Sequence, residues 1–275
     1  MTRGQIDLNR MYLDKWQMHI ALSHDVVQGL KLPSTKLLSQ CTTVDLNKHT
    51  AWYVKPINTW GGHQISKFEK ADDQGWVLRH QTGFAQRYRH IAQLVQGLRF
   101  IYDPTATIVQ QAAPVATWRN RPFDIRVLCQ RESGRWVFAG SLARVAAQGS
   151  LVSNLGTGHG EVVPTREVLN VLYPKRSKQS RVQQRLKQCS LRICEILDSY
   201  ASFDEVGVDY GLSPEGQVWL FEVNTNDRLG GPSRALFAEL PDKTTYEQIE
   251  TRAEAIRREW FSQLVREIMN ADQTP

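Results

Sequence analysis

The 275-residue chain is long enough for one large domain or two lobes, and its 41% of hydrophobic residues predicts a globular protein. Its net charge of +6 makes polyanions plausible partners, but nucleotides, acidic peptides and nucleic acid all fit that description. The start lacks an apolar signal region, no apolar run is long enough to span a bilayer, and the four cysteines form no CxxC pair. We therefore expect a cytoplasmic protein with reduced, buried thiols and no membrane partner.

The first half of the chain alternates between helical and strand patterns. In chain order we predict a helix over 9–23, a turn-rich connector over 29–39, a strand over 50–57, a turn over 58–64, a hairpin from strands 65–68 and 75–81, a helix over 87–97 and a strand over 105–114. The last of these ends in a proline and links the first lobe to a second.

The second half contains three β-rich runs and two long helices. We predict strands over 123–130, 135–146 and 150–155, a flexible loop over 156–160, a helix over 180–200, a hairpin over 207–226 and a helix over 246–269. The apolar stripe of the first long helix comprises Val182, Leu186, Cys189, Ile193, Ile196 and Tyr200. That of the last helix comprises Tyr246, Ile249, Ala253, Ile256, Trp260 and Leu264.

The order of the elements indicates the fold class. Strand-rich segments are separated by single helices without regular βαβ alternation, which favours an α+β fold with two lobes and a cleft over a doubly wound parallel sheet. The helix over 180–200 carries many basic residues, which are the usual footprint of nucleic-acid binding. Its charges lie off the apolar stripe, so a solvated face is favoured and nucleic acid is not expected as a partner.

The hairpin places three polar side chains on one face. The connection Ser213-Pro214-Glu215-Gly216 predicts that Leu212 pairs with Gln217 and that Asp209 lies opposite Leu220. Side chains then alternate: Val206, Val208, Tyr210, Trp219, Phe221 and Val223 face the core, and Asp209, Glu222 and Asn224 face away.

Two carboxylates and a carboxamide oxygen on one face are suitable ligands for Mg²⁺, which prefers a few carboxylates together with phosphate oxygens and water. The alternative is a solvated sheet face that happens to be acidic, and Leu220 on the same face supports it. The hairpin by itself leaves both interpretations open.

Three cationic residues lie in or beside predicted strands. Lys55 ends a strand before the Gly61-Gly62 turn, whose backbone N–H groups could close over phosphates, although no Walker A loop occurs. Arg126 and Arg144 interrupt β-rich runs, where an arginine facing a cleft binds phosphate or carboxylate oxygens in pairs. Considered alone, each of these three cationic residues is more simply interpreted as an ordinary surface residue. Together with an acidic hairpin they favour phosphoryl transfer, in which fixed cations and Mg²⁺ meet the developing negative charge.

Eight segments in order carry a resemblance to a known family: "DKW", "YVKPI-NTWGGHQI", "IVQQ", "FDIRVL", "ARV", "SNL", "GVDYG" and "FEVNTN". The set resembles the ATP-grasp superfamily and, within it, the YheC/YheD family of proteins associated with the spore coat. It extends from about Leu13 to Arg228. The resemblance implies an ATP-grasp fold in which two α+β lobes hold ATP between antiparallel sheets.

The resemblance also implies a role for each matching residue. For the nucleotide, Lys15 and Lys55 match lysines that bind its phosphates, Gly62 matches the glycine-rich loop, and Val109, Gln110 and Gln111 match the hinge strand whose backbone meets adenine. Asn154 matches an asparagine on the phosphate side or the metal side of the site. Arg126 and Arg144 match catalytic arginines, and the Mg²⁺ ligands are matched by Asp209, Glu222 and Asn224. The implied enzyme is an ADP-forming ligase that joins a small-molecule or peptide carboxylate to an amine through an acyl phosphate. An idle nucleotide-binding protein of the spore coat or envelope is the alternative.

Three departures from the family pattern bear on these roles. Gln64 stands where the glycine-rich loop usually has another glycine, and the segment after Asn224 lacks the usual Ser-Pro-Gly type of turn. The amino-terminal domain of many relatives is expected to be missing, so a partner or a second copy would supply its contacts. We divide the chain into an N-terminal helix and connector (1–50), a small ATP-grasp lobe (51–112) and a large lobe with the metal site and C-terminal helix (113–275).

Overall fold

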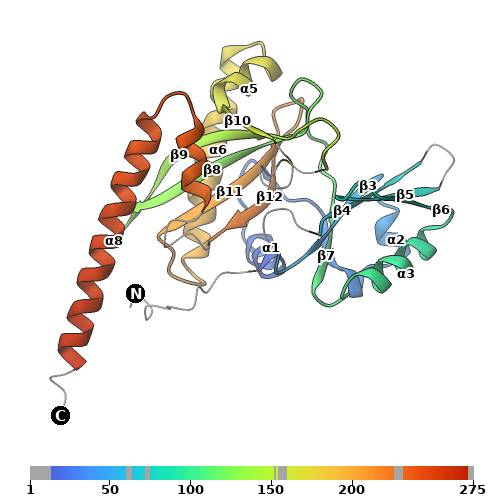
Figure 1. Ribbon diagram of the computed structural model, residues 1–275, viewed down its shortest axis with the longest axis horizontal. Helices are drawn as coiled ribbons and strands as arrows, with labels where there is room; N and C mark the ends of the chain where they lie inside the picture. The colour runs from blue at the N-terminus through green and yellow to red at the C-terminus, as the bar shows by residue number, and fades with distance from the viewer. Residues whose placement is uncertain are drawn as a thin grey trace.

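The chain folds into two lobes, each built on its own sheet (Figure 1). The computed structural model describes residues 14–59, 64–71, 75–151, 153, 160–225 and 232–271. Within these ranges each sheet has six strands, and all neighbouring strands are antiparallel except β1 and β12, which are parallel. The mixture of helices with two largely antiparallel sheets confirms the predicted α+β class.

The small lobe contains the strands in the order β2-β7-β3-β4-β5-β6. Its elements are β2 (Thr35–Leu37), η1 (Leu38–Gln40), α2 (Thr43–Leu46), β3 (Ala51–Pro56), β4 (Ser66–Lys70), β5 (Trp76–His80), β6 (Ala85–Tyr88), α3 (Ile91–Ile101) and β7 (Thr107–Gln111). Helices α2 and α3 cover one face of the sheet, where Leu46, Phe68 and Leu98 are fully buried in one hydrophobic cluster. That single core makes the small lobe a packed unit.

The large lobe contains the strands in the order β1-β12-β11-β8-β9-β10. Its elements are α1 (Lys15–His24), β1 (Leu30–Lys31), β8 (Phe123–Glu132), β9 (Arg135–Val145), β10 (Glu161–Pro164), α5 (Thr165–Leu172), α6 (Arg176–Leu197), β11 (Glu205–Leu212), β12 (Val218–Asn224), α7 (Pro232–Ala235), η2 (Leu236–Glu239) and α8 (Thr244–Ala271).

Both faces of this sheet are covered. Helices α1, α5 and α6 pack on one face, where Val127 and Tyr210 lie in the larger core, and η2 and the start of α8 pack on the other against Leu128. The first eight consecutive residues of β8 are therefore buried, the polar ones among them included. No helix in the described part of the chain is both long and apolar enough to cross a membrane.

The chain begins its described course in the large lobe, enters the small lobe at β2 and returns after β7. The predicted connector over 29–39 is therefore not a plain turn region, because β1 joins one sheet and β2 joins the other. The segment 1–50 is divided between the lobes in its described part. Strands β2 and β7 are neighbours, with Thr35 paired with Gln110. The two crossings between the lobes consequently lie side by side.

Two predicted helices differ from the structure in their bounds. The helix predicted over 87–97 begins at Ile91, because Ala85–Tyr88 alternates between exposed and half-buried residues and pairs with β5 as a strand. The helix predicted over 180–200 ends at Leu197, which leaves Tyr200 outside the buried stripe and 48% exposed. The exposed basic residues of α6 form the solvated face that was predicted.

The hairpin of β11 and β12 has a different register from the predicted one. Leu212 pairs with Val218, not Gln217, and Asp209 pairs with Glu222, not Leu220. A β-bulge separates these pairs, since Tyr210 pairs with Leu220 and leaves Phe221 as the extra residue. The bulge turns Leu220 into the core, and Phe221 faces the space between the lobes.

Candidate active site

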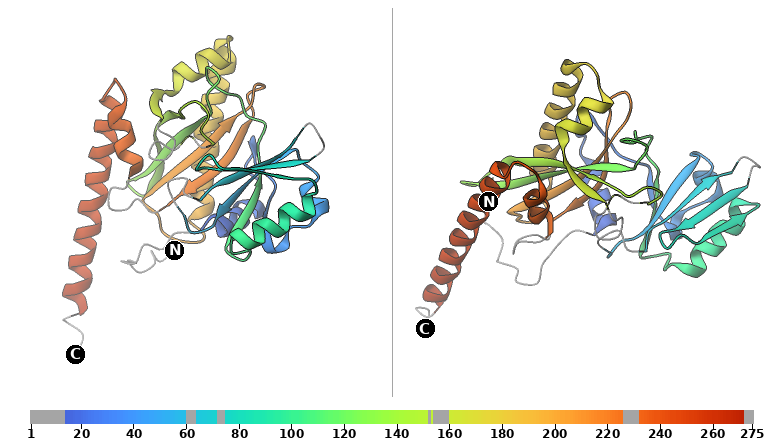
Figure 2. Two further views of the ribbon diagram at one scale, coloured as in Figure 1. Left: turned by 45° about the vertical axis from the view of Figure 1, so that its right-hand side comes forward. Right: turned by 45° about the horizontal axis from the view of Figure 1, so that its top comes forward.

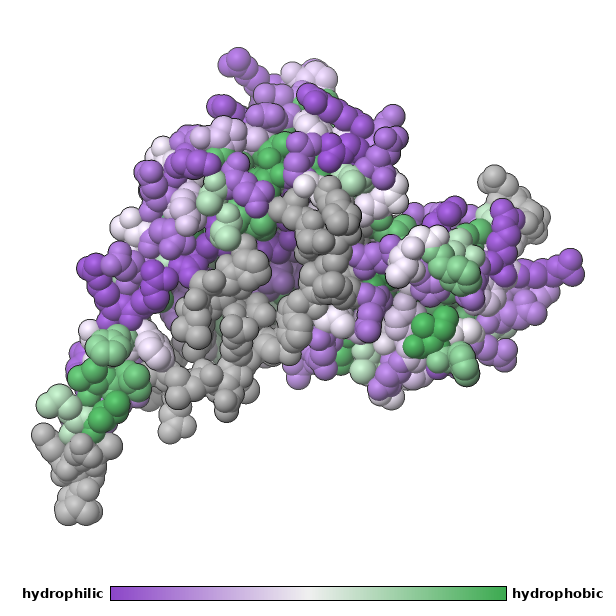
Figure 3. Space-filling model, in the orientation of Figure 1, coloured by the Kyte–Doolittle hydropathy of each residue, from purple (hydrophilic) through white to green (hydrophobic). Residues whose placement is uncertain are grey.

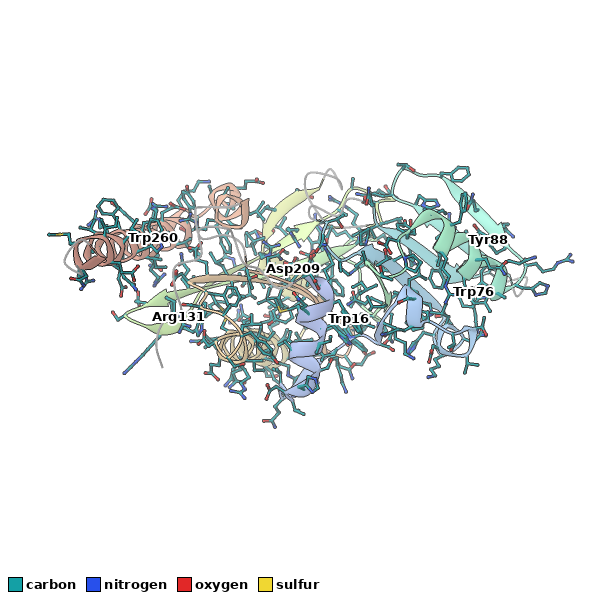
Figure 4. The ribbon with its side chains drawn as sticks, turned by 90° about the horizontal axis from the view of Figure 1, so that it is seen from below. Trp16, Trp76, Tyr88, Arg131, Asp209 and Trp260 are labelled. Carbon is teal, nitrogen blue, oxygen red and sulfur yellow. The ribbon has the colours of Figure 1, made fainter. Side chains whose placement is uncertain are left out.

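A cleft between the lobes is lined by both sheets and by the segment that joins β7 to β8. Its walls include Tyr53, Lys55, Ile65, Lys67, Gln110, Gln111, Ala112, Ala113, Val115, Asp124, Arg126, Arg144, Ser153, Asp209, Phe221, Glu222 and Asn224. The cavity between these walls has a volume of about 330 Å³. Asp209 lies near the middle of the molecule, where the two lobes meet (Figure 4). Sites for single small ligands usually hold about 300–1000 Å³, so the cleft has the size of a small-ligand site.

Asp209 is held by two arginines from neighbouring strands. The antiparallel register puts it directly opposite Arg126 of β8. Arg126 donates to both Asp209 oxygens, from Nε to Oδ1 and from Nη2 to Oδ2, the second at 3.0 Å. Arg144 of β9 adds a contact from Nη2 to Oδ2 at 2.8 Å. The three side chains are at most 7% exposed, so the Asp209 carboxylate is fixed in place.

Asp124 completes the cluster and was missed by the sequence prediction. It lies opposite Arg144, which donates from Nε and Nη2 to its two oxygens at 2.8 and 2.7 Å. Ser153 Oγ donates to the same carboxylate. Asp124 is two residues before Arg126 on one strand, so their shared face was the available signal. We call Asp124, Arg126, Arg144 and Asp209 the buried quartet; its two positive and two negative charges balance.

The quartet sets the protonation of Asp209. Burial raises the pKa of the Asp209 carboxyl, but the guanidiniums of Arg126 and Arg144 outweigh it and bring the pKa down to about 2. The carboxylate is therefore ionised at neutral pH, as a metal ligand must be.

The other two predicted metal ligands lie next to Asp209. Asn224 Nδ2 is 3.4 Å from Asp209 Oδ2, and Glu222 is paired with Asp209 across the strands. In the described residues, no group of three or more His, Cys, Asp or Glu side chains is arranged to hold a metal ion. The oxygen donors here are two carboxylates and one carboxamide, and the Asp209 carboxylate already accepts contacts from Arg126 and Arg144. This oxygen donor set still fits Mg²⁺, provided that Asp209 exchanges an arginine contact for the ion.

Lys15, in the first turn of α1, lines a smaller pocket next to the cleft. The Asp14 side chain accepts hydrogen bonds from the backbone N–H groups of Trp16 and Gln17 at 2.9 and 2.8 Å, which starts the helix there. Lys15 Nζ lies 3.4 Å from Glu222 Oε1 and donates to the Thr59 carbonyl oxygen. The predicted phosphate lysine therefore lies beside a predicted metal ligand.

Lys55 approaches the same region from the small lobe. Its Nζ donates to Gln110 Oε1 at 2.6 Å and lies 5.6 Å from the centre of the Tyr53 ring. Burial lowers the pKa of the Lys55 amine to about 8, against the opposing effect of the Glu222 carboxylate. Near neutral pH most of the amine is charged, and this fraction is sensitive to pH.

We expect nucleotide affinity to fall about tenfold between about pH 7 and pH 9, because Lys55 loses its proton over this interval and one pKa unit is worth a factor of ten. A bound anion favours the ammonium form, so binding near pH 8 also takes up protons. Calorimetry in buffers of different ionisation enthalpy measures both effects. Lys55→Arg keeps its charge throughout and is the control. An equal loss of affinity in that variant would assign the pH dependence to another group.

The remaining predicted site residues fall into three groups. Gln110 and Gln111 line the cleft, but the Val109 side chain is fully buried in the small-lobe core, and its backbone pairs with both β2 and β3. The structure therefore does not bring Val109 to the cleft. Gly62 and Asn154 lie outside the described residues. Gln64 has a φ of 58°, a left-handed conformation that favours glycine and accounts for the glycine expected there from the family pattern.

Phe221 is a second cleft residue that sequence reasoning missed, because its position depends on the bulge. Its ring packs over Gly211, where an added Cβ would collide with the rings and methyls of Phe221 and Val115. The absence of a side chain at Gly211 therefore sets how far the Phe221 ring extends into the cleft.

Gly211→Ala is expected to weaken nucleotide binding at least tenfold, because overpacking of about 1–3 kcal/mol pushes the Phe221 ring into the cleft. Gly140→Ala is the matched control. An added Cβ at Gly140 meets Thr245 and Phe237 near the other face of the sheet, so we expect lower stability with unchanged binding. Thermal unfolding and equilibrium nucleotide titration of both variants separate the two effects. Equal affinities in the two variants would contradict this role of Phe221.

Comparisons of the sequence with known proteins show which family it matches. The family model described as "YheC/D like ATP-grasp" matches residues 6–253. The chain is 23% identical over 239 residues to the endospore coat-associated protein YheD of Bacillus subtilis, covering 84% of this chain and 50% of that protein. It thus spans about half the length of this curated relative.

Solved structures are similar to this chain at low sequence identity. D-alanyl-alanine synthetase A from Vibrio cholerae is 12% identical with a TM-score of 0.50, covering 89% of this chain and 64% of that one. D-alanine–D-alanine ligase from Bacillus anthracis is 14% identical with a TM-score of 0.47, covering 90% of this chain and 66% of that one. At such identities the likeness concerns the fold.

Proposed function

The chain belongs to the YheC/D-like ATP-grasp family, and on that premise we propose that it is an ADP-forming ligase that uses ATP and Mg²⁺ to join a carboxylate to an amine. One observation supports this most strongly: fixed cations and oxygen-bearing side chains from both lobes line one cleft. The cations are Lys55, Arg126 and Arg144, and the oxygen donors are Asp209, Glu222 and Asn224; Lys15 lies in an adjoining pocket that shares Lys55 and Glu222 with the cleft. Phosphoryl transfer requires such positioned charges more than it requires a nucleophile from the protein.

Each group has a defined part in the proposed reaction. Lys15 and Lys55 neutralise the phosphates from opposite lobes. Asp209, Glu222 and Asn224 would hold Mg²⁺, which supplies further neutralisation of phosphate oxygens when bound. Arg126 and Arg144 are buried behind Asp209 and present positive charge to the reacting carboxylate and phosphoryl group. Of the predicted hinge, Gln110 and Gln111 remain at the cleft edge, and Phe221 contributes an apolar surface for the base.

The proposed chemistry has two steps. A substrate carboxylate oxygen attacks the terminal phosphorus of ATP, the bond to ADP breaks, and an acyl phosphate forms. An amine then attacks the acyl carbon and loses a proton, and inorganic phosphate leaves as the amide forms.

The contacts of Arg126 and Arg144 with the Asp209 carboxylate favour a second candidate function, nucleotide binding without turnover. If these contacts persist with nucleotide bound, the chain binds ATP without turnover, as an idle protein associated with a spore coat or envelope. The name of the B. subtilis relative fits this alternative.

Mass spectrometry of products distinguishes the two functions. The protein is incubated with ATP, Mg²⁺ and pools of amino acids, small carboxylates and amines, and ADP and phosphate are measured together. The ligase predicts a product whose mass is the sum of an acid and an amine less water, formed with equal amounts of ADP and phosphate. Calorimetric binding of ATP with no phosphate release from any pool would instead indicate the idle protein.

A further inference from the structure

Helix α8 continues far beyond the body of the large lobe (Figures 1 and 2). Its first turns are anchored in the core, where Ile249 is fully buried and Ala253 is 3% exposed. No described residue of α8 after Ala253 is buried. The 18 residues from there to Ala271, which we call the distal half, span about 27 Å at the usual helical rise.

The distal half is apolar along one broad face. Phe261, Ile268 and Met269 are 62%, 54% and 59% exposed. Together with Trp260, Leu264 and Val265 they recur at positions one and four apart, which places them on one side of the helix. Figure 3 shows this hydrophobic cluster at the lower left, toward the free end of α8. Scattered single apolar residues need no explanation, but a contiguous face of six indicates a binding surface.

The proposed ligase reaction does not use this surface. Trp260 lies at one end of the molecule, away from Asp209 and the cleft (Figure 4). The match to the family model also ends at residue 253, where the helix leaves the body. The distal half therefore has a role separate from catalysis.

The charges around the apolar face favour a protein partner. Residues 254–271 contain three arginines and three glutamates, so the distal half has no net charge. Glu254 and Arg258 pair with each other at 2.5 Å along the helix. A helix that binds an anionic membrane or a nucleic acid carries an excess of positive charge, and this one does not.

We propose that the distal half of α8 pairs with the distal half of a second copy of this chain, antiparallel and about a two-fold axis between Leu264 and Val265. In this register Phe261 faces Ile268 of the second copy at the centre of the helix pair. Parallel pairing would bring both large lobes to the same end of helices only about 8–10 Å apart. Antiparallel pairing places the lobes at opposite ends.

The available area agrees with a dimer of moderate affinity. The six apolar side chains, of which Phe261, Val265, Ile268 and Met269 are 36–62% exposed, offer at most roughly 500 Å² per copy, so the pair buries at most about 1000 Å², which is near the lower limit for specific interfaces. We therefore expect dissociation in the micromolar range.

Sedimentation velocity over a range of protein concentrations tests the dimer. Phe261→Glu and Ile268→Glu are each expected to weaken dimerisation at least tenfold, because a carboxylate would be buried without a partner. Phe100→Glu is the matched control, since Phe100 is 93% exposed on α3 of the small lobe and is expected to leave dimerisation unchanged. Unchanged nucleotide binding in all three variants shows that they fold.

Disulfide cross-linking tests the register. The native cysteines are buried, so added thiols react selectively. A mixture of Phe261→Cys and Ile268→Cys chains should cross-link as mixed pairs, and neither variant should cross-link with itself. Self-linked pairs of Phe261→Cys would overturn the antiparallel arrangement. A protein that stays monomeric, whether or not its distal half binds phosphatidylcholine or phosphatidylglycerol vesicles, overturns the dimer.

Discussion

Arg144→Ala is expected to lower the free energy of unfolding by about 3–5 kcal/mol at neutral pH, because it leaves the buried carboxylates of Asp124 and Asp209 with one arginine between them. Chemical denaturation measures this loss. The loss should shrink as the pH falls toward 5. Without Arg144, burial keeps a folded-state carboxyl pKa above its unfolded value, so the folded variant takes up a proton more readily and gains relative stability in acid.

Two controls separate this effect from the general loss of an ion pair. Arg192→Ala removes half of a surface pair with Glu195, whose side chains are 50% and 56% exposed, and should change stability by less than about 0.5 kcal/mol. The double variant Asp124→Asn with Arg144→Gln removes one charge of each sign and should recover most of the stability. A double variant as unstable as Arg144→Ala would show that packing, not charge balance, holds the quartet together.

Glu222→Gln is expected to lower Mg²⁺-dependent ATP turnover at least a hundredfold, because it removes one of two proposed carboxylate ligands at the site where phosphate charge develops. Glu222 is 32% exposed and its ion pair with Lys15 is only partly buried, so the variant should fold normally. Phosphate release under saturating ATP, measured over a Mg²⁺ titration, records the loss and any shift in metal dependence.

The matched control is Glu161→Gln, which alters a surface partner of Arg121 and should leave turnover unchanged. Asp209→Asn should also abolish turnover but with a loss of stability, since it unbalances the quartet. Turnover of Glu222→Gln within twofold of the native protein would remove Glu222 from the site.

The fold class and the neighbourhood of the site could be predicted from the sequence, because strand alternation and the order of short motifs are local signals. The three proposed metal ligands illustrate the limit. They do share a face, but the predicted register was wrong by one residue beside the turn and by two at Asp209, and the shared face is kept only because the bulge at Phe221 adds the second residue. A bulge depends on how a strand meets its neighbours, so periodicity cannot show it.

The quartet could not be read from the sequence for a similar reason. Arg126 and Arg144 were predicted as single clamps for a ligand. Their pairing with Asp124 and Asp209 arises only when β8 lies between β9 and β11, and strand order is a property of the whole sheet. Strand order also explains why Val109, a predicted cleft residue, is not in the cleft. It lies on a central strand, so its side chain packs in the core and its backbone pairs with both neighbouring strands.

The adjacency of β2 and β7 governs how the two lobes can move. The small lobe is an uninterrupted insertion in the large one, and its ends leave from neighbouring strands one sheet spacing apart. Two adjacent connections hinder twisting of the small lobe against the large lobe but allow it to bend about the line that joins them. We therefore expect domain closure over a nucleotide to be a rotation about this one axis. The same geometry makes the segment from Thr35 to Gln111 a candidate for excision as an autonomous folding unit.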